Sequence, residues 1–320
     1  MKLPALKGGA SKKWNFLLYY APCPVLMEEL AGDLPVKGDH SMKTKITILC
    51  ENTVGRVIGS GEHGFSAFVE TDHDNSLFDT GNGHAIVSNS LALNKDLRTA
   101  RRVFLSHGHS DHTGGLPEVL KLTGKVDVHA HPSIFLDRIA VRKVEGEEVR
   151  RFAGLVYKKT YLEFLGANFV LNQEFSEVQK GLFLTGEVPR RTNFEKNDPS
   201  LFVEIDGKMI QDTLMDDQSL VLDTGKGLVL LLGCAHSGVI NIVHHVVNKT
   251  GKQKFKAILG GTHLDFLTPE QLEESIKALK QMEIEKIGFS HCTGMKAASR
   301  LHQEFGNRFV YGCVGTVFDF

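Results

Sequence analysis

Four side chains of types that bind metal ions lie within six residues of the chain, directly after the compact apolar run Arg102–Ser106. The run is too short for a helix and is predicted to be a buried strand. Residues i and i+2 of an extended chain point the same way, so His107 and His109 can converge on one cation. If Asp111 opens a helix, Asp111 and His112 lie side by side at its start and can reach a second cation. Imidazole and carboxylate suit zinc, and also iron or manganese.

A regular alternation of strands and helices is predicted between residues 219 and 305. Three of the expected strands are Leu228–Leu232, Phe255–Leu259 and Lys286–Phe289. The turns that follow them carry, in chain order, His236, His263 and His291. The sequence therefore offers metal-binding side chains at several strand ends.

One helix in this region has a well-marked start. Thr268 is suited to be an N-cap, proline occupies the next position, and glutamate lies in the first turn. We expect a helix over Pro269–Met282.

The middle of the chain, residues 125–215, carries a less regular pattern. The segment Pro132–Lys143 could form a helix, and a Gly-Ala turn follows Tyr161–Leu165. This variety predicts a cap or insertion within 125–215, laid over one edge of a core that the rest of residues 42–320 forms.

Residues 1–41 precede the first clear strand and are expected to form a poorly ordered extension. Lysines followed by the apolar stretch Trp14–Met27 loosely resemble a secretory signal, but Pro22 and Pro24 interrupt the stretch. The 5 cysteines are widely spaced and form no Cys-x-x-Cys pair, which indicates a reducing compartment. We therefore expect a cytoplasmic protein.

Charge balance and apolar run length argue against two classes of partner. The 37 Lys+Arg and 38 Asp+Glu residues give a formal net charge of −1, so no global positive field draws the chain to nucleic acid. An apolar run of about 18 residues, which a membrane-spanning helix needs, does not occur. We expect neither nucleic acid nor a membrane as partner, and the sequence does not indicate an oligomeric state.

The segment His107–His112 resembles the signature of the metallo-β-lactamase superfamily, His-x-His-x-Asp-His after a central strand. Other motifs resemble one subfamily, named after the archaeal 7,8-dihydropterin-6-methyl-4-(β-D-ribofuranosyl)aminobenzene-5′-phosphate synthases. They include Glu51–Thr53, Thr185–Arg190, Gly233–Gly238, Gly260–Leu264 and His291–Gly294, whereas Asp79–Gly81 resembles an earlier motif of the whole superfamily. The resemblance covers roughly residues 42–320. It implies an α+β fold, a four-layer αβ/βα sandwich with a metal site at the strand ends between the two sheets.

The resemblance also implies a set of metal ligands. His107, His109, Asp111 and His112 match the signature directly, and His291 lies where the superfamily places its last metal-binding histidine. The expected intermediate histidine and bridging aspartate are not clear. His236 is favoured as a further ligand. The other candidates near the site are Cys234, as a thiolate ligand or a small buried side chain, and Glu187, Asp217 and Gln218 for the intermediate position.

Three more residues are candidates for supporting the site or binding substrate. Asp79 is expected to support the site from behind, as the resemblance implies. His263 could contribute to the site, contact substrate or serve only as a turn residue. Arg190 is interpreted as a clamp for an anionic small molecule, since guanidinium binds phosphate through two hydrogen bonds.

These features predict a metal-dependent enzyme that acts on a small anionic substrate. It would hold two divalent cations, zinc first and manganese, iron or magnesium as alternatives, about 3.5–4 Å apart. As a hydrolase of a phosphate, ester or lactone it would use a metal-bound water that Asp111 helps to orient. The subfamily implies an alternative, transfer of a dihydropterin-methyl group from its diphosphate to a ribofuranosyl-aminobenzene phosphate. A second alternative is a metal-binding protein without turnover.

Overall fold

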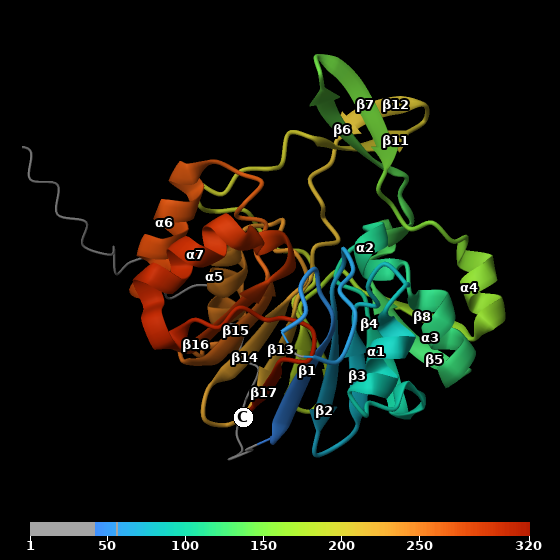
Figure 1. The fold of residues 1–320 in the computed structure, drawn as a ribbon, viewed down its shortest axis with the longest axis horizontal. Helices are drawn as coiled ribbons and strands as arrows, with labels where there is room; N and C mark the ends of the chain where they lie inside the picture. The colour runs from blue at the N-terminus through green and yellow to red at the C-terminus, as the bar shows by residue number, and fades with distance from the viewer. Residues whose placement is uncertain (1–41, 56) are drawn as a thin grey trace, which may run out of the picture. The chain divides into compact units, whose positions relative to one another are not determined.

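The computed structural model of the chain describes residues 42–55 and 57–320. The expectations for residues 1–41 lie outside this part. Figure 1 shows two large sheets face to face, with helices on the outer face of each. The predicted four-layer α+β sandwich is therefore confirmed.

The first sheet has seven strands in the order β17-β1-β2-β3-β4-β5-β8. The last four strands of this order run parallel, and β1 pairs antiparallel with both of its neighbours. The strands are β1 (Thr44–Cys50), β2 (Ser66–Thr71), β3 (Asn75–Phe78), β4 (Ala100–Phe104), β5 (Val126–Ala130), β8 (Ala167–Leu171) and β17 (Val317–Asp319).

The second sheet has six strands in the order β16-β15-β14-β13-β10-β9, and its first three are parallel. The strands are β9 (Ser176–Gln179), β10 (Leu182–Leu184), β13 (Leu220–Asp223), β14 (Leu228–Leu232), β15 (Phe255–Gly261) and β16 (Ile284–Ser290). Three strands expected from the sequence are thus confirmed as β14, β15 and β16.

Helices cover the two outer faces (Figure 1). Beside the first sheet lie α1 (Ile86–Ala92), α2 (Ser110–Thr113), α3 (Leu116–Thr123) and α4 (Lys159–Leu165). Beside the second lie α5 (Val239–Thr250), α6 (Pro269–Lys280) and α7 (Gly294–Phe305). Short 3₁₀ turns occur at Leu97–Thr99, Pro132–Phe135, His291–Thr293 and Gly306–Arg308. No helix in the described residues is long and apolar enough to cross a membrane.

The hydrophobic core forms three main layers, one between the sheets and one under the helices on each side. Strand β14 shows how one apolar run serves two of them. Leu230 and Leu232 pack toward the helices, whereas Val229 and Leu231 pack toward the other sheet. Alternate side chains of a strand point to opposite faces, so a strand covered on both faces is apolar throughout.

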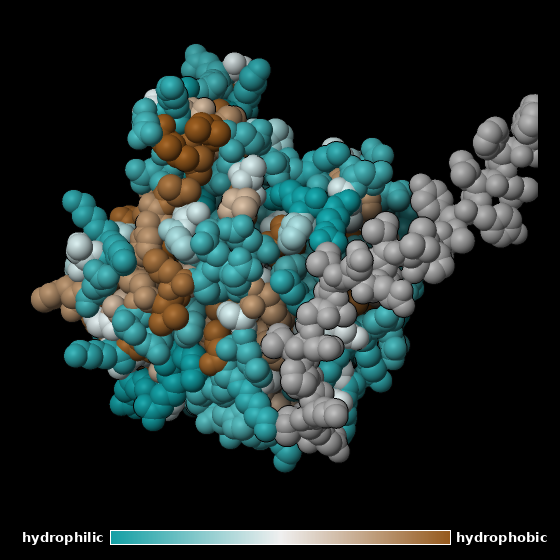
Figure 2. Space-filling view, turned by 180° about the vertical axis from the view of Figure 1, so that it is seen from behind, coloured by the Kyte–Doolittle hydropathy of each residue, from teal (hydrophilic) through white to brown (hydrophobic). Residues whose placement is uncertain are grey.

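A third, four-stranded sheet projects beyond the carboxyl ends of the large-sheet strands (Figure 1). Its order is β12-β11-β6-β7, with β6 (Arg138–Val144), β7 (Glu147–Phe152), β11 (Leu201–Ile205) and β12 (Lys208–Gln211). Figure 2 shows hydrophobic surface within this lobe, where Val144, Val149, Ile205 and Ile210 are exposed.

The region 125–215 is divided between the core and this third sheet. Its strands β5, β8, β9 and β10 belong to the large sheets, so the separate sheet is smaller than the whole region. The prediction of a helix over Pro132–Lys143 is wrong, because a 3₁₀ turn is followed there by β6. Strand β6 pairs on both sides, with β7 and β11, and this pairing favours the extended conformation.

Candidate metal centre

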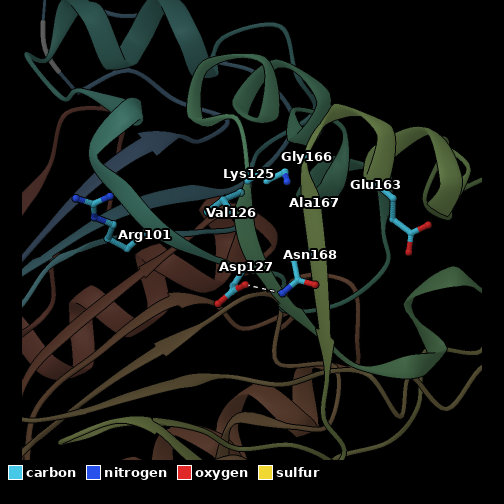
Figure 3. A pocket seen from close by; sticks show the side chains of 8 residues that line it. All are labelled: Arg101, Lys125, Val126, Asp127, Glu163, Gly166, Ala167 and Asn168. Atoms are coloured by element: carbon cyan, nitrogen blue, oxygen red, sulfur yellow. Dashed lines mark hydrogen bonds between the residues drawn. The ribbon is translucent and has the colours of Figure 1, made fainter.

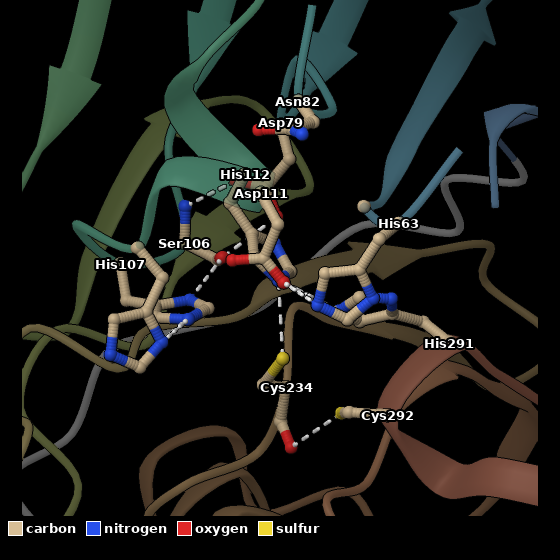
Figure 4. A network of polar contacts seen from close by, with 12 residues as sticks. His63, Asp79, Asn82, Ser106, His107, Asp111, His112, Cys234, His291 and Cys292 are labelled. Atoms are coloured by element: carbon tan, nitrogen blue, oxygen red, sulfur yellow. Dashed lines mark hydrogen bonds and ion pairs between the residues drawn. The ribbon is translucent and has the colours of Figure 1, made fainter. Parts of the chain in front are cut away.

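The side chains predicted to bind metal come from four loops at the same end of the two large sheets. His107, His109, Asp111 and His112 follow β4, and Cys234 and His236 follow β14. His263 follows β15, and His291 directly follows β16. Carboxyl ends of neighbouring parallel strands lie at one edge of a sheet, which is why distant segments meet here (Figure 4).

Three imidazoles form a first group, His107, His109 and His236. One nitrogen from each lies within 4.8 Å of the others, and His107 Nε2 is 3.0 Å from His109 Nδ1. His236 Nε2 is buried without a hydrogen-bond partner in the described residues. Burial, together with neighbouring imidazoles, lowers the pKa of His107 and His236 well below the usual value. Neutral, converging imidazoles fit a divalent cation such as zinc.

A second group lies beside the first and contains Asp111, His112, His291 and Cys234. His112 Nε2 is 3.2 Å from His291 Nε2 and 3.1 Å from Cys234 Sγ. Asp111 Oδ2 is 3.3 Å from His291 Nε2. Burial lowers the pKa of His112, but the Asp79 and Asp111 carboxylates outweigh it and raise the pKa to about 9. A site that attracts a proton so strongly also suits a metal cation.

Asp79 orients two of these imidazoles from behind (Figure 4). Its Oδ2 accepts hydrogen bonds from His112 Nδ1 and from the Ser106 hydroxyl, each 2.7 Å long. The Ser106 oxygen in turn accepts from His107 Nδ1 at 2.9 Å. With the Nδ1 atoms engaged as donors, both Nε2 atoms are left to face the cluster. A carboxylate behind a histidine in this way is typical of metal ligands.

His291 is held by the segment after β1. Its Nδ1 donates to Asn52 Oδ1 at 2.9 Å, and its backbone N–H donates to the buried Glu51 carboxylate at 2.7 Å. Ser106, Asn52 and Glu51 were not among the site residues predicted from the sequence. The contiguous segment Glu51–Thr53 of the subfamily motif is the signal that could have indicated the last two.

A second cysteine reaches the centre across a strand. Cys234 Sγ, Cys292 Sγ and a nitrogen of His291 all lie within 4.8 Å of one another, although β15 separates β14 from β16. Gly261 makes this approach possible, since a Cβ there would stand 2.8 Å from Cys292 Sγ and 2.3 Å from the Gly233 carbonyl oxygen. Cys292 was not predicted as a site residue.

His263 lies next to the first group without belonging to it. Its ring centroid is 4.4 Å from that of His236, and its Nε2 donates to Asp198 Oδ2 at 2.9 Å. Burial opposes the charged form of His263, but the bond to Asp198 outweighs it and raises the pKa to about 9. The pKa of Asp198 is correspondingly low, about 2, although burial alone would raise it. This ion pair lines the cavity above the histidines.

Three further candidates lie outside both donor groups. Arg190 donates to the carbonyl oxygens of His236, at 2.7 Å, and Thr213, at 2.9 Å, so its guanidinium holds the His236 loop. Asp217 accepts from the Ser237 N–H at 2.7 Å and supports the same loop. Gln218 donates to the Leu105 carbonyl oxygen at 3.0 Å.

Glu187, the remaining candidate for the intermediate position, faces another histidine. Its Oε1 lies 3.0 Å from His131 Nε2 and also accepts from Gln173. His236, favoured from the sequence as a further ligand, lies with His107 and His109.

A cavity opens over the two groups, and the third sheet forms its roof. Residues of the metal loops line the floor, and Ala140, Arg142, Arg151, Ala153 and Leu201 line the roof. A different hollow lies at the amino ends of β5 and β8, where Asp127 accepts a 2.7 Å hydrogen bond from Asn168 (Figure 3). None of the candidate site residues lines that second hollow.

A family profile described as the metallo-β-lactamase superfamily matches residues 59–149. The chain belongs to this superfamily, whose members depend on metal ions. The chain is 33% identical over 259 residues to the 7,8-dihydropterin-6-methyl-4-(β-D-ribofuranosyl)-aminobenzene-5′-phosphate synthase of Methanocaldococcus jannaschii, covering 78% of this chain and 86% of the relative. The subfamily resemblance is thereby confirmed.

Two other relatives are similar over most of their length. An uncharacterized protein of the same archaeon is 34% identical over 279 residues, which is 85% of this chain and 98% of that protein. A solved structure described as a metal-dependent hydrolase of the β-lactamase superfamily is 28% identical, with a TM-score of 0.72. That match covers 86% of this chain and 98% of the other.

Proposed function

We propose that the protein is a metal-dependent hydrolase of a small anionic substrate. The observation that carries this proposal is the pair of adjacent donor groups, most of whose members line one cavity: His107/His109/His236 and Asp111/His112/His291/Cys234. Two divalent cations there would polarise the bond under attack and lower the pKa of a bound water toward about 7. The relative described as a metal-dependent hydrolase supports this reaction.

Residues of the chain supply the other parts of such a reaction. Asp111 is only partly buried, with 17% of its side chain exposed, and it faces both His291 and His63 at 3.3 Å. Its carboxylate can orient an attacking water. The charged His263, held by Asp198, can bind an anionic group of the substrate.

A second candidate is the synthase reaction of the archaeal relative. The 33% identity over most of both chains favours it. In that reaction the centre would hold the diphosphate of a dihydropterin-methyl diphosphate while a ribofuranosyl-aminobenzene phosphate attacks the methyl carbon. The carbon–oxygen bond breaks, a carbon or nitrogen of the aminobenzene partner forms the new bond and gives up its proton to solvent, and diphosphate leaves.

Metal analysis and a two-variant activity panel test the proposal. The purified chain is expected to bind about two equivalents of zinc. It is assayed with a phosphodiester, a lactone and the pterin diphosphate pair. Hydrolysis without a joined product supports the hydrolase, whereas a joined product with diphosphate release supports the synthase.

The matched variants are His107→Ala in the first group and His73→Ala in the exposed turn between β2 and β3. We expect His107→Ala to lose at least about 100-fold in turnover and His73→Ala to keep the wild-type rate. Wild-type protein that takes up no transition metal, or a His107→Ala variant with unchanged turnover, would contradict the proposal.

A further inference from the structure

The β6–β7 hairpin presents one of its faces to the cavity. Ala140 on β6 lies opposite Arg151 on β7, and Arg142 lies opposite Val149. Alternate residues of a strand share a face, so Ala140, Arg142 and Arg151 point to the same side. Both arginines line the cavity over the metal loops. Their positions are diagonal neighbours across the hairpin, about 7–8 Å apart, which is within reach of long side chains.

A contact with an aromatic ring places Arg142 near His263. The guanidinium of Arg142 is 5.8 Å from the centroid of the Phe266 ring, which stacks on His263 at 4.8 Å. This contact with Phe266 positions Arg142 on the His263 side. Arg151 lines the same cavity, together with His63. An anion held between the two guanidinium groups would therefore sit in the cavity above the donor groups.

Neither arginine is neutralised by the described residues. No carboxylate of this part of the chain forms an ion pair with Arg142 or Arg151. Other arginines of the same two strands do have such partners. Arg138 pairs with Asp212 and Asp216, and Arg150, on the opposite face of β7, pairs with Glu148. The two cavity-facing guanidinium groups keep their donors free for a ligand.

We propose that Arg142 and Arg151 form an anion subsite that binds a phosphate monoester on the substrate, separate from the anionic group at the metal centre. The inference rests on the proposed function, because the other end of the substrate lies at the donor groups on the floor. Guanidinium binds phosphate oxygens through paired, charge-assisted hydrogen bonds. The substrate class is thus a small molecule with two anionic positions, one at the metals and one phosphate under the hairpin.

Calorimetric titration of the zinc-loaded full chain tests the subsite with two probes. Ribose 5-phosphate carries one phosphate, whereas ribose 1,5-bisphosphate carries one for each position. The double variant Arg142→Gln/Arg151→Gln should raise the Kd of the bisphosphate at least about 10-fold and leave that of the monophosphate within about 2-fold. Arg150→Gln is the matched control, one residue away on the outer face, and should bind both probes as the wild type does.

The outcomes separate the two proposals. Wild-type protein that fails to take up zinc contradicts the proposed function and the subsite with it. Zinc-loaded wild type that binds both probes with equal affinity contradicts the subsite alone, as does a double variant that weakens both equally or neither. Equal weakening by Arg150→Gln would also overturn it, because the effect would then be one of general charge. Zinc content of each variant checks that the fold is intact.

Discussion

Asp79 organises both donor groups with a single buried carboxylate. It bonds directly to His112 and, through Ser106, reaches His107. One of its oxygens also accepts the Ser106 backbone N–H at 2.7 Å. Because the two imidazoles belong to different donor groups, a substitution of Asp79 should disturb the ring orientation in both groups.

We expect Asp79→Asn to lower zinc affinity about 10- to 100-fold, because the amide has one acceptor oxygen where the carboxylate accepts three hydrogen bonds on two, and the ring orientations are lost. Competition with a chromogenic chelator measures this affinity. Asp127→Asn is the control, because Asp127 bonds to Asn168 in the hollow of Figure 3, which none of the candidate site residues lines. Equal zinc affinities for the Asp79 variant and the wild type would show that the carboxylate does not orient ligands.

Some of the site residues could be predicted from the sequence and others could not, for a physical reason. His107–His112 is visible because its members are contiguous and follow a buried strand. Cys292 joins the centre only because Gly261 lets side chains from β14 and β16 meet across β15, and spacing along the chain does not reveal that. Arg190 looked like a substrate clamp by residue type, whereas the structure shows backbone carbonyls as its partners.

Among the elements, helix α6 and strand β6 show what local pattern can predict. The helix begins at Pro269, and the Thr268 side chain accepts a hydrogen bond from the Gln271 N–H, as expected of an N-cap. All signals for that helix are local. For β6 they are only partly local, because it pairs with the adjacent β7 and also with β11, about 60 residues away in the chain. That is why the helix expected over Pro132–Lys143 was wrong.

The helix after the His236 loop has a cap that comes from a distant segment. Glu195 is buried, and its two oxygens accept from the Ile240 and Asn241 N–H groups of α5 at 2.7 and 2.8 Å. Backbone N–H groups at a helix start have no partner within the helix, and a carboxylate also suits the positive end of the helix dipole.

Glu195→Ala should lower the free energy of unfolding by about 1–3 kcal/mol, because buried N–H groups lose their acceptors. Urea unfolding of the zinc-loaded chain measures this. Glu270→Ala, at the exposed first turn of α6, should cost no more than about 1 kcal/mol. Similar losses for the two variants would mean that Glu195 is not a structural cap.

At the scale of the whole molecule, bound metal should stabilise the folded chain, because a ligand that binds only the folded state adds to the free energy of unfolding. At an excess of about 100 times Kd, a bound ligand contributes about 2.7 kcal/mol. For a domain of this size 1 kcal/mol corresponds to about 2–4 °C in Tm. We expect a chelator to lower the Tm by roughly 5–10 °C, as measured by calorimetry.

His107→Ala is the reference for this prediction, since a protein with one donor group disrupted has less bound metal to lose. Its Tm should fall by a smaller amount on chelation. The same shift in the variant and the wild type would mean that the chelator acts elsewhere on the chain.

The four-layer sandwich was predictable from the sequence, since the His107–His112 motif and the motifs after the later strands resemble those of one superfamily. The third sheet was not, because its four strands are short segments paired across residues 138–211. The roof arginines therefore could not be placed over the site from the sequence.

The donors are divided between the two large sheets. The loop after β4 supplies His107, His109, Asp111 and His112, whereas the six-stranded sheet supplies Cys234, His236 and His291. Each of the two donor groups therefore takes ligands from both halves of the sandwich. Tight cation uptake during refolding would consequently begin only once both halves have docked, and the rate of zinc capture would report that late assembly step.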